Sequence, residues 1–300
     1  MMSVTSKRIR LSLATALLAA VLPTCLAAQD APADLPRAVS LLGASEPGEI
    51  RLRLTAEQLE SVGIPEIAYT AADREVADLA DIGLRTLRFG SRIEGTFRSA
   101  LGSLTFRSTV RPDGRILVEN VLPNRRGTLS LLISLETRTA EPGYPAGVRI
   151  TPADRFLFRA LAVALTREVG DKTAETDLLL RAAQLWGDHP LQEVGLRRIA
   201  AKIDKSWTNL CGRSSAALAH DATDHGLITE TLAVGPNSAN CRSRCGAGCG
   251  ALIGTSAWTV DCGEHDRCEQ HHSCCVSCQD EFNSASDDYL FASNCRLSGW

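Results

Sequence analysis

The chain has 300 residues, a formal net charge of −3 and 22% charged residues. Lys and Arg are dispersed rather than gathered in runs, so the composition excludes a strongly basic nucleic-acid-binding protein, and we expect no nucleic-acid partner. The length suits two domains of ordinary size, while the sequence predicts no particular oligomeric state.

Residues 1–28 have the three-part pattern of a secretory signal peptide. Basic residues between positions 7 and 10 precede an uncharged run over 11–22, and small residues follow as far as Ala28. The apolar run is too short to span a membrane. A lipoprotein alternative would place the modified residue at Cys25. The pattern predicts a secreted or periplasmic protein.

The cysteines are concentrated near the C-terminus. Removing the signal peptide leaves ten of the 11 cysteines, and nine of those ten lie between Cys241 and Cys295. An even number of cysteines in an exported chain predicts disulfides, here five with no free thiol. We therefore expect two domains, an α+β domain of unknown role over 29–205 and a disulfide-rich domain over 206–300.

The first domain alternates between apolar and polar residues from 92 to 137, with a turn at Pro112-Asp113-Gly114, which predicts an antiparallel sheet with one buried face. A helical period follows from Thr151-Pro152, a cap with a first-turn proline. Two further helices are expected over 173–186 and 190–203. Because this region contains no catalytic motif, we predict that it is a partner or pro-like module packed against the disulfide-rich domain.

In the second domain, the residue pattern predicts a short helix over 214–220, a longer helix that begins at Trp258 and another that begins near Asn283. If these last two helices are antiparallel and the chain reverses near 275–278, the residue level with His265 lies near Asp287 and Asp288. A carboxylate there could accept a hydrogen bond from the second imidazole nitrogen of His265. It would fix the tautomer of this ring and stabilise the imidazolium once it forms.

Two motifs carry the chemistry of this domain. A glycine-rich loop, Cys245-Gly246-Ala247-Gly248-Cys249-Gly250, precedes Cys262-Gly263-Glu264-His265-Asp266-Arg267-Cys268. Glycine tolerates positive φ, so the loop can turn its carbonyls inward, and a nearby carboxylate can complete an oxygen cage for a hard cation. The adjacent histidine is then a candidate base beside a calcium ion.

This arrangement resembles the active-site region of secreted phospholipase A2, in its bacterial form, and the resemblance covers the last third of the chain. It implies a disulfide-rich helical hairpin that hydrolyses lipid esters at a phospholipid or membrane surface. It also implies that the carbonyls of Arg244, Gly246 and Gly248 and the carboxylate of Asp266 bind Ca²⁺. The loop cysteine Cys245 would pair with Cys262.

The same resemblance gives catalytic roles. His265 would activate a water, and an aspartate on the partner helix would orient the histidine. We assign that aspartate to Asp288, because Asp288-Tyr289-Leu290-Phe291 has the Asp-x-x-Phe spacing of bacterial members, with Asp287 as its alternative.

Two alternatives stay open. The first is a non-catalytic, disulfide-stapled binding or toxin-like module, because Asp261, Cys249 and Glu269 stand where the family usually has cysteine, glycine and an aromatic residue. The second is a zinc cluster formed by residues at ligand spacing, namely Cys268, His271, His272, Cys274, Cys275 and Cys278.

Overall fold

The structure is a computed structural model. It describes residues 48–62, 78–168, 173–191, 196–201, 210–222, 226–236, 241–246, 257–271 and 278–295. All of these residues fall in one compact unit. The predicted signal peptide lies outside the described residues.

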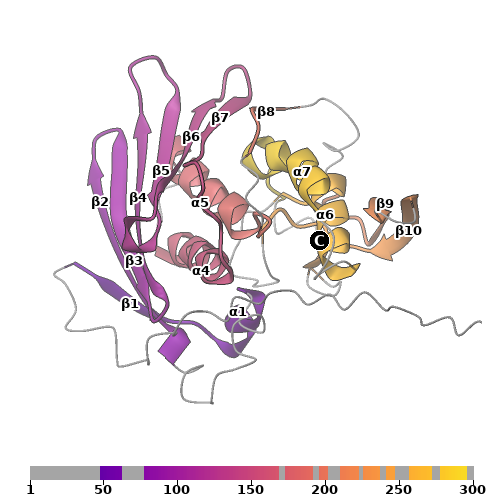
Figure 1. The fold of residues 1–300 in the computed structure, drawn as a ribbon, viewed down its shortest axis with the longest axis horizontal. Coiled ribbons are helices and arrows are strands. Elements are labelled where there is room, and N and C mark those ends of the chain that lie inside the picture. Colours follow the sequence, from indigo (N-terminus) through magenta and orange to yellow (C-terminus); the bar gives the residue numbers. More distant parts are fainter. Residues whose placement is uncertain are drawn as a thin grey trace, which may run out of the picture. The chain divides into compact units, whose positions relative to one another are not determined.

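The sheet is an antiparallel meander in which each strand pairs with the next along the chain (Figure 1). Helix α1 (Ala56–Ser61) follows its first strand, and a 3₁₀ turn, η1 (Pro123–Arg125), joins two later strands. The strands of this sheet are β1 (Ile50–Arg53), β2 (Asp81–Phe89), β3 (Arg92–Ser99), β4 (Gly102–Val110), β5 (Ile116–Val121), β6 (Thr128–Ser134), β7 (Thr139–Gly143) and β8 (Ile199–Ala200).

The period-two pattern explains this sheet, because alternate residues of a strand face opposite sides. Leu104 and Phe106 of β4 are buried, as are Leu129 and Leu131 of β6. Between β4 and β5, the amide of Gly114, with φ +77°, donates to the carbonyl of Arg111 at 3.0 Å. The predicted antiparallel sheet, its turn and its single buried face are confirmed.

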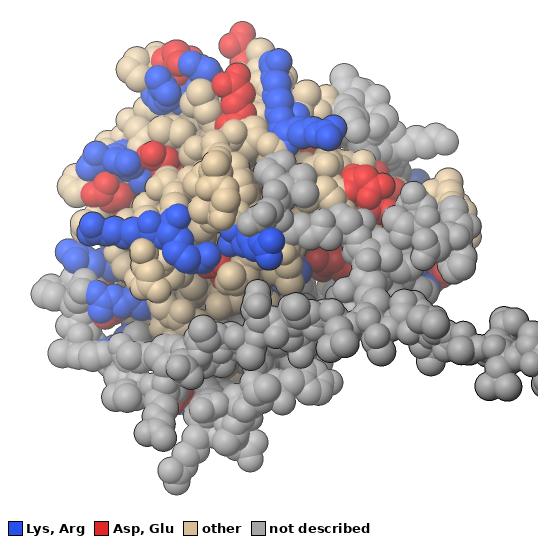
Figure 2. Space-filling model, in the orientation of Figure 1, with Lys and Arg blue, Asp and Glu red and all other residues tan. Residues whose placement is uncertain are grey.

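Polar residues on the opposite face of the sheet form cross-strand ion pairs. Arg107 and Glu119 stand opposite each other on β4 and β5, and the Nη2 of Arg107 lies 2.9 Å from a Glu119 carboxylate oxygen. Figure 2 shows basic and acidic side chains interspersed over the face in view.

Two helices, α4 (Pro152–Glu168) and α5 (Ala174–Gly187), pack against the buried face of the sheet. At the start of α4, the amide of Asp154 donates to the Thr151 hydroxyl at 3.2 Å, and the amide of Thr151 donates to the Asp154 carboxylate at 2.8 Å. This reciprocal cap satisfies two amide groups at the helix end, so the predicted helix start is confirmed.

The C-terminal region contains a hairpin of β9 (Ser215–Ala222) and β10 (Gly226–Ala233), followed by helices α6 (Val260–His271) and α7 (Gln279–Phe291). Helix α6 packs on both β9 and α7, and α5 contacts α7 as well as β4 and β5. Three disulfides join described cysteines in this region: Cys211–Cys295, Cys245–Cys262 and Cys268–Cys278. The sulfur of Cys241 is also disulfide-bonded.

Two of the helix predictions were wrong. The expected helix over 214–220 is strand β9, whose Leu218 is opposite Glu230 of β10. The expected helix over 190–203 contains strand β8, where Ile199 pairs with Ala140 at the sheet edge. In both segments, pairing with a distant strand outweighs a local helical pattern, because propensity is a weak prior.

The described structure is therefore α+β, with an antiparallel sheet, helices and disulfides. The division into domains at residues 205 and 206 stays a prediction. Among the described residues, no helix has both the length and the apolar character needed to cross a membrane.

We predict that the disulfides differ in their contributions to stability. Cys211–Cys295 closes 84 residues and Cys268–Cys278 closes 10, so the loop-entropy contributions are about 4 to 5 and about 3 kcal/mol, respectively. Replacing Cys211 and Cys295 together by Ala should lower the free energy of unfolding more than replacing Cys268 and Cys278. Chemical denaturation of the two double variants measures the order, and the reverse order would contradict the prediction.

Candidate functional site

The first residue of the glycine-rich loop, Cys245, is fixed to the start of α6. Cys245 and Cys262 form the disulfide that the family resemblance implied, so that pairing is confirmed. The amide of Cys245 donates to the carbonyl of Ala257 at 2.9 Å, and Arg244 forms an isolated antiparallel bridge with Trp258. Arg244 and Cys245, at the start of the loop, therefore cannot move away from α6 without breaking both covalent and backbone links.

Asp266 lies against the backbone just before this loop. Its carboxylate accepts a 2.9 Å hydrogen bond from the amide of Ser243, next to the predicted ligand Arg244. Although Asp266 as a whole is half-buried, removal of its carboxylate from water raises its pKa well above the usual value. Gly246 has φ +126°, a conformation that favours glycine. The predicted ligand Gly248 lies outside the described residues.

His265 is on the same helix and is only 1% exposed. Its ring contacts Phe282 of α7, with 5.3 Å between the centroids, and its Nε2 lies 3.8 Å from an oxygen of Glu269. Burial lowers the pKa of His265, and the charges of Arg155 and Arg159 lower it further, while Glu269 and Asp188 act in the opposite direction.

Glu269 lies one turn after His265 and is bound by an arginine from α4. The Nη2 of Arg155 donates to both carboxylate oxygens, at 2.8 and 3.0 Å, and the Nε donates to the carbonyl of Gly187 at 3.1 Å. Burial opposes ionisation of Glu269, but Arg155, His265 and Arg159 outweigh it and lower the pKa to about 2. Glu269 is therefore an anion at neutral pH.

A second carboxylate, Asp188, comes from the turn after α5. Its Oδ1 accepts from the Nε of Arg159 at 2.9 Å, and its Oδ2 accepts from the hydroxyl of Tyr289 at 2.7 Å. Since Arg159 is on α4 and Tyr289 on α7, Asp188 connects three helices. The two arginine–carboxylate pairs place a polar network beside His265.

His189, next in the chain, is a second fully buried imidazole. Its ring stacks on Tyr144 at 5.6 Å and meets the edge of Phe282 at 5.2 Å. The Nδ1 lies 2.8 Å from the carbonyl of Pro190, so it donates the proton there. Burial lowers the pKa of His189 to about 4, although the Pro190 carbonyl acts in the opposite direction.

Arg244 adds a buried positive charge near the loop. Its residue is 3% exposed, and burial lowers its pKa to about 10, while the charges of Asp188 and Asp266 act to raise it. The guanidinium partly balances the acidic groups in this region. Arg244 therefore has two features at the site: its backbone carbonyl is a predicted Ca²⁺ ligand, and its guanidinium is a buried cation.

The two predicted orienting aspartates are buried in α7. Asp287 is 2% exposed and Asp288 is 0% exposed. The ring of α7 that lies beside His265 is that of Phe282, five and six residues before these aspartates. The disulfide Cys268–Cys278 shows the same register, because it joins α6 to the residue just before α7. The predicted reversal near 275–278 lies mostly outside the described residues.

Several residues at the site were missed by the sequence reasoning. They are polar residues of the first region, for which no chemistry was predicted, together with one glutamate of α6: Arg155, Arg159, Asp188, His189 and Glu269. A weak signal existed in Gly187-Asp188-His189-Pro190. It joins a carboxylate and an imidazole, but we interpreted it only as a break between helices.

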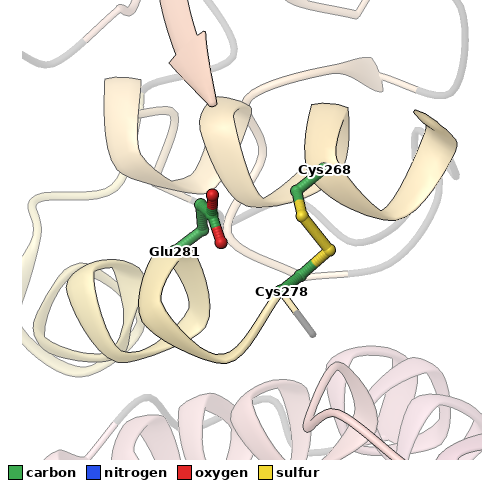
Figure 3. Close-up of side chains that lie close together, drawn as sticks. All are labelled: Cys268, Cys278 and Glu281. Carbon is green, nitrogen blue, oxygen red and sulfur yellow. A yellow bond between two sulfur atoms is a disulfide. The ribbon is translucent and has the colours of Figure 1, made fainter. Parts of the chain in front are cut away.

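A different group, formed by Cys268, Cys278 and Glu281, brings three potential metal-ligand atoms within 4.8 Å of one another (Figure 3). Cys268 and Cys278 are joined in a disulfide. Thiolates bind zinc, whereas a disulfide offers none. The oxidised protein therefore lacks two of the six residues of the predicted zinc cluster as thiolate ligands, and His272, Cys274 and Cys275 lie outside the described residues.

Comparisons of the chain with protein-family models, with curated proteins and with solved structures gave no match.

We predict an acid-sensitive contribution of His189 to stability. The unfolded histidine has a pKa near 6.5 and the folded one near 4, so between these values the unfolded chain binds more protons. The free energy of unfolding should therefore fall as the pH drops below 6.5, by up to about 2 kcal/mol at pH 5. Arg155 and His265 face the ring and contribute to the low pKa.

His189→Phe removes this titration and keeps an aromatic ring. Denaturant unfolding of both proteins at pH 7 and pH 5 measures the effect, and the wild type should lose more stability than the variant over this interval. Equal losses in the two proteins would contradict the prediction.

Proposed function

We propose that this protein is an exported, calcium-dependent lipid ester hydrolase of the phospholipase A2 type. The observation that carries the proposal is the position of the His265-Asp266 pair on α6, with Asp266 hydrogen-bonded to Ser243, two residues before Cys245, which is itself disulfide-bonded to Cys262 of α6. A candidate base and a candidate cation ligand thereby become neighbours on one rigid element, as this chemistry requires.

The residues at the loop fit a calcium ion. Asp266 supplies a carboxylate that is removed from water and lies beside the backbone of Ser243. The carbonyls of Arg244, Gly246 and Gly248 would complete a set of hard oxygen ligands with it. A calcium ion bound there would polarise the ester carbonyl and bind the lipid phosphate.

The chain's own side chains would perform the proton transfers. His265, which burial keeps neutral, would accept a proton from the attacking water and later deliver it to the leaving alcohol. A buried carboxylate would hold the imidazole in the required tautomer, the role that the sequence assigned to Asp288 with Asp287 as the alternative. The surrounding burial strengthens each of these electrostatic interactions.

One observation favours a second candidate, a binding module that retains the fold without catalysis. His265 is 1% exposed, and Phe282 and Glu269 lie against its ring. A general base must reach the water that it activates. Turnover therefore requires an opening at this site, whereas a binding module requires none.

We predict calcium-dependent release of fatty acid from phospholipid vesicles by the purified protein. His265→Gln should remove essentially all turnover, while the calcium-dependent rise in melting temperature persists because the histidine is not an ion ligand. Asp288→Asn should lose less activity than His265→Gln. Asp287→Asn, a substitution of the neighbouring residue, is the control for Asp288→Asn. Equal inactivity of wild type and His265→Gln on a broad lipid panel would favour the binding module.

We also predict that Asp266→Asn abolishes the calcium response. At about a hundred times its dissociation constant, a ligand adds roughly 2.7 kcal/mol to stability, which should raise the melting temperature of the wild type by several degrees. Thermal unfolding with millimolar calcium and with chelator measures this shift. Identical wild-type curves under the two conditions would exclude the calcium site.

A further inference from the structure

We propose that Glu269 is the carboxylate that orients His265, and that Arg155 of α4 holds Glu269 in place for this role. The proposal rests on the proposed function of His265 as the general base. It assigns positioning roles to two residues, one of them in the region for which the sequence predicted no chemistry.

The first step is the geometry on α6. Residues four apart lie on the same helix face, and the Nε2 of His265 is 3.8 Å from the Oε1 of Glu269. Within the described structure this buried Nε2 makes no hydrogen bond. A buried ring nitrogen without a partner is costly. Glu269 is an acceptor placed so that a small side-chain movement would satisfy it.

The second step is the anchor of Glu269. A glutamate on a helix surface normally samples several rotamers, but Arg155 donates to both of its carboxylate oxygens, at 2.8 and 3.0 Å. Both bonds come from one guanidinium nitrogen, Nη2, and as charge-assisted hydrogen bonds they hold the carboxylate of Glu269 close to Arg155. The side chain of Arg155 is itself 6% exposed and is bound to the carbonyl of Gly187, so the anchor is rigid.

The third step is what this arrangement does to the imidazole. A carboxylate facing Nε2 favours the tautomer with the proton on Nε2, which leaves the lone pair on Nδ1 to accept a proton. As the imidazolium forms, its attraction to the carboxylate strengthens. This interaction is stronger in the transition state than in the resting enzyme, and so it lowers the barrier.

Two other ionisable groups near His265 are each held by another partner. Asp188 is bound to Arg159 and Tyr289, and His189 donates to Pro190. On α7, the ring beside His265 is the apolar Phe282. Glu269 is the carboxylate with an oxygen within 4 Å of the imidazole among the described ion pairs.

A tautomer measurement tests the proposal without requiring activity. Long-range ¹H–¹⁵N correlation spectra of histidine-labelled protein at pH 8 should show His265 protonated at Nε2 alone. Glu269→Leu should give a mixture of both tautomers, and Arg155→Met should shift the signals in the same direction by less. Wild-type signals in both variants would overturn the proposal, as would a tautomer change in Asp288→Asn alone.

Kinetics supply the second measurement. Glu269→Leu should lower kcat about 10- to 100-fold with little change in KM. This loss of kcat is smaller than the roughly 10⁴-fold loss caused by altering a fully buried triad carboxylate, because Glu269 is partly exposed. Arg155→Lys should retain more activity than Arg155→Met. An unchanged kcat in Glu269→Leu would overturn the assignment. The kcat of Asp288→Asn is measured beside it for comparison.

Glu264→Gln is the matched control. Glu264 is also on α6 and accepts from the amide of Ala219 at 2.8 Å, a structural contact with β9. Its substitution should lower stability but leave the His265 tautomer unchanged. If the wild type hydrolyses no lipid, the proposed function fails, and the tautomer spectra still decide whether Glu269 orients His265. If Glu269→Leu does not fold, the Arg155 variants give the same decision.

Discussion

The buried guanidinium of Arg155 is the interaction on which the arrangement of the site depends. It comes from α4, binds a carbonyl at the end of α5, and pairs with Glu269 of α6. An arginine that is 5% exposed must be compensated, because a buried unpaired charge is strongly destabilising. The three helices therefore keep these relative positions, and His265, one turn before Glu269, is placed with them.

A second set of contacts fixes α7 to α5. The guanidinium of Arg181 donates to the carbonyls of Tyr289 and Ala292, at 3.1 and 3.0 Å. These carbonyls lie at the C-terminal end of α7, where they have no partner within the helix. A cation is also favourable at that end. Together with the Tyr289–Asp188 hydrogen bond, this cap makes α5 the element that links the sheet to the disulfide-bonded helices.

Burial gives the site its electrostatic character. It lowers the pKa values of His265 and His189 and raises that of Asp266. Each shift has the same origin, because removing a group from water disfavours its charged form. Arginine pairs then decide which carboxylates stay ionised, and Glu269 is one of them. Burial thus favours a neutral His265 beside an anion, Glu269, which is the state that the proposed general base requires.

The sequence by itself determined the local features of this protein. Alternating apolar residues predicted the sheet, Thr151-Pro152 predicted the start of α4, and the family resemblance predicted the Cys245–Cys262 disulfide. These signals are short-range or belong to a recognisable motif, so one sequence is enough to identify them. Ser215–Ala222 was misassigned because its partner strand, β10, decides its conformation.

Only the tertiary structure decided which charged residues meet His265. Arg155 and Glu269 are 114 residues apart, and the sequence marks Glu269 only as a departure from the family pattern and Arg155 not at all. A buried arginine cannot be told from a surface arginine in a sequence. Apolar residues recur with the period of a helix or strand, but the positions of charged residues follow no period that would identify their partners. The register of α7 against α6 was also decided by packing, as the Cys268–Cys278 disulfide and the contact of Phe282 with His265 show. Long-range pairing depends on the fold that brings the partners together, and local patterns do not encode it.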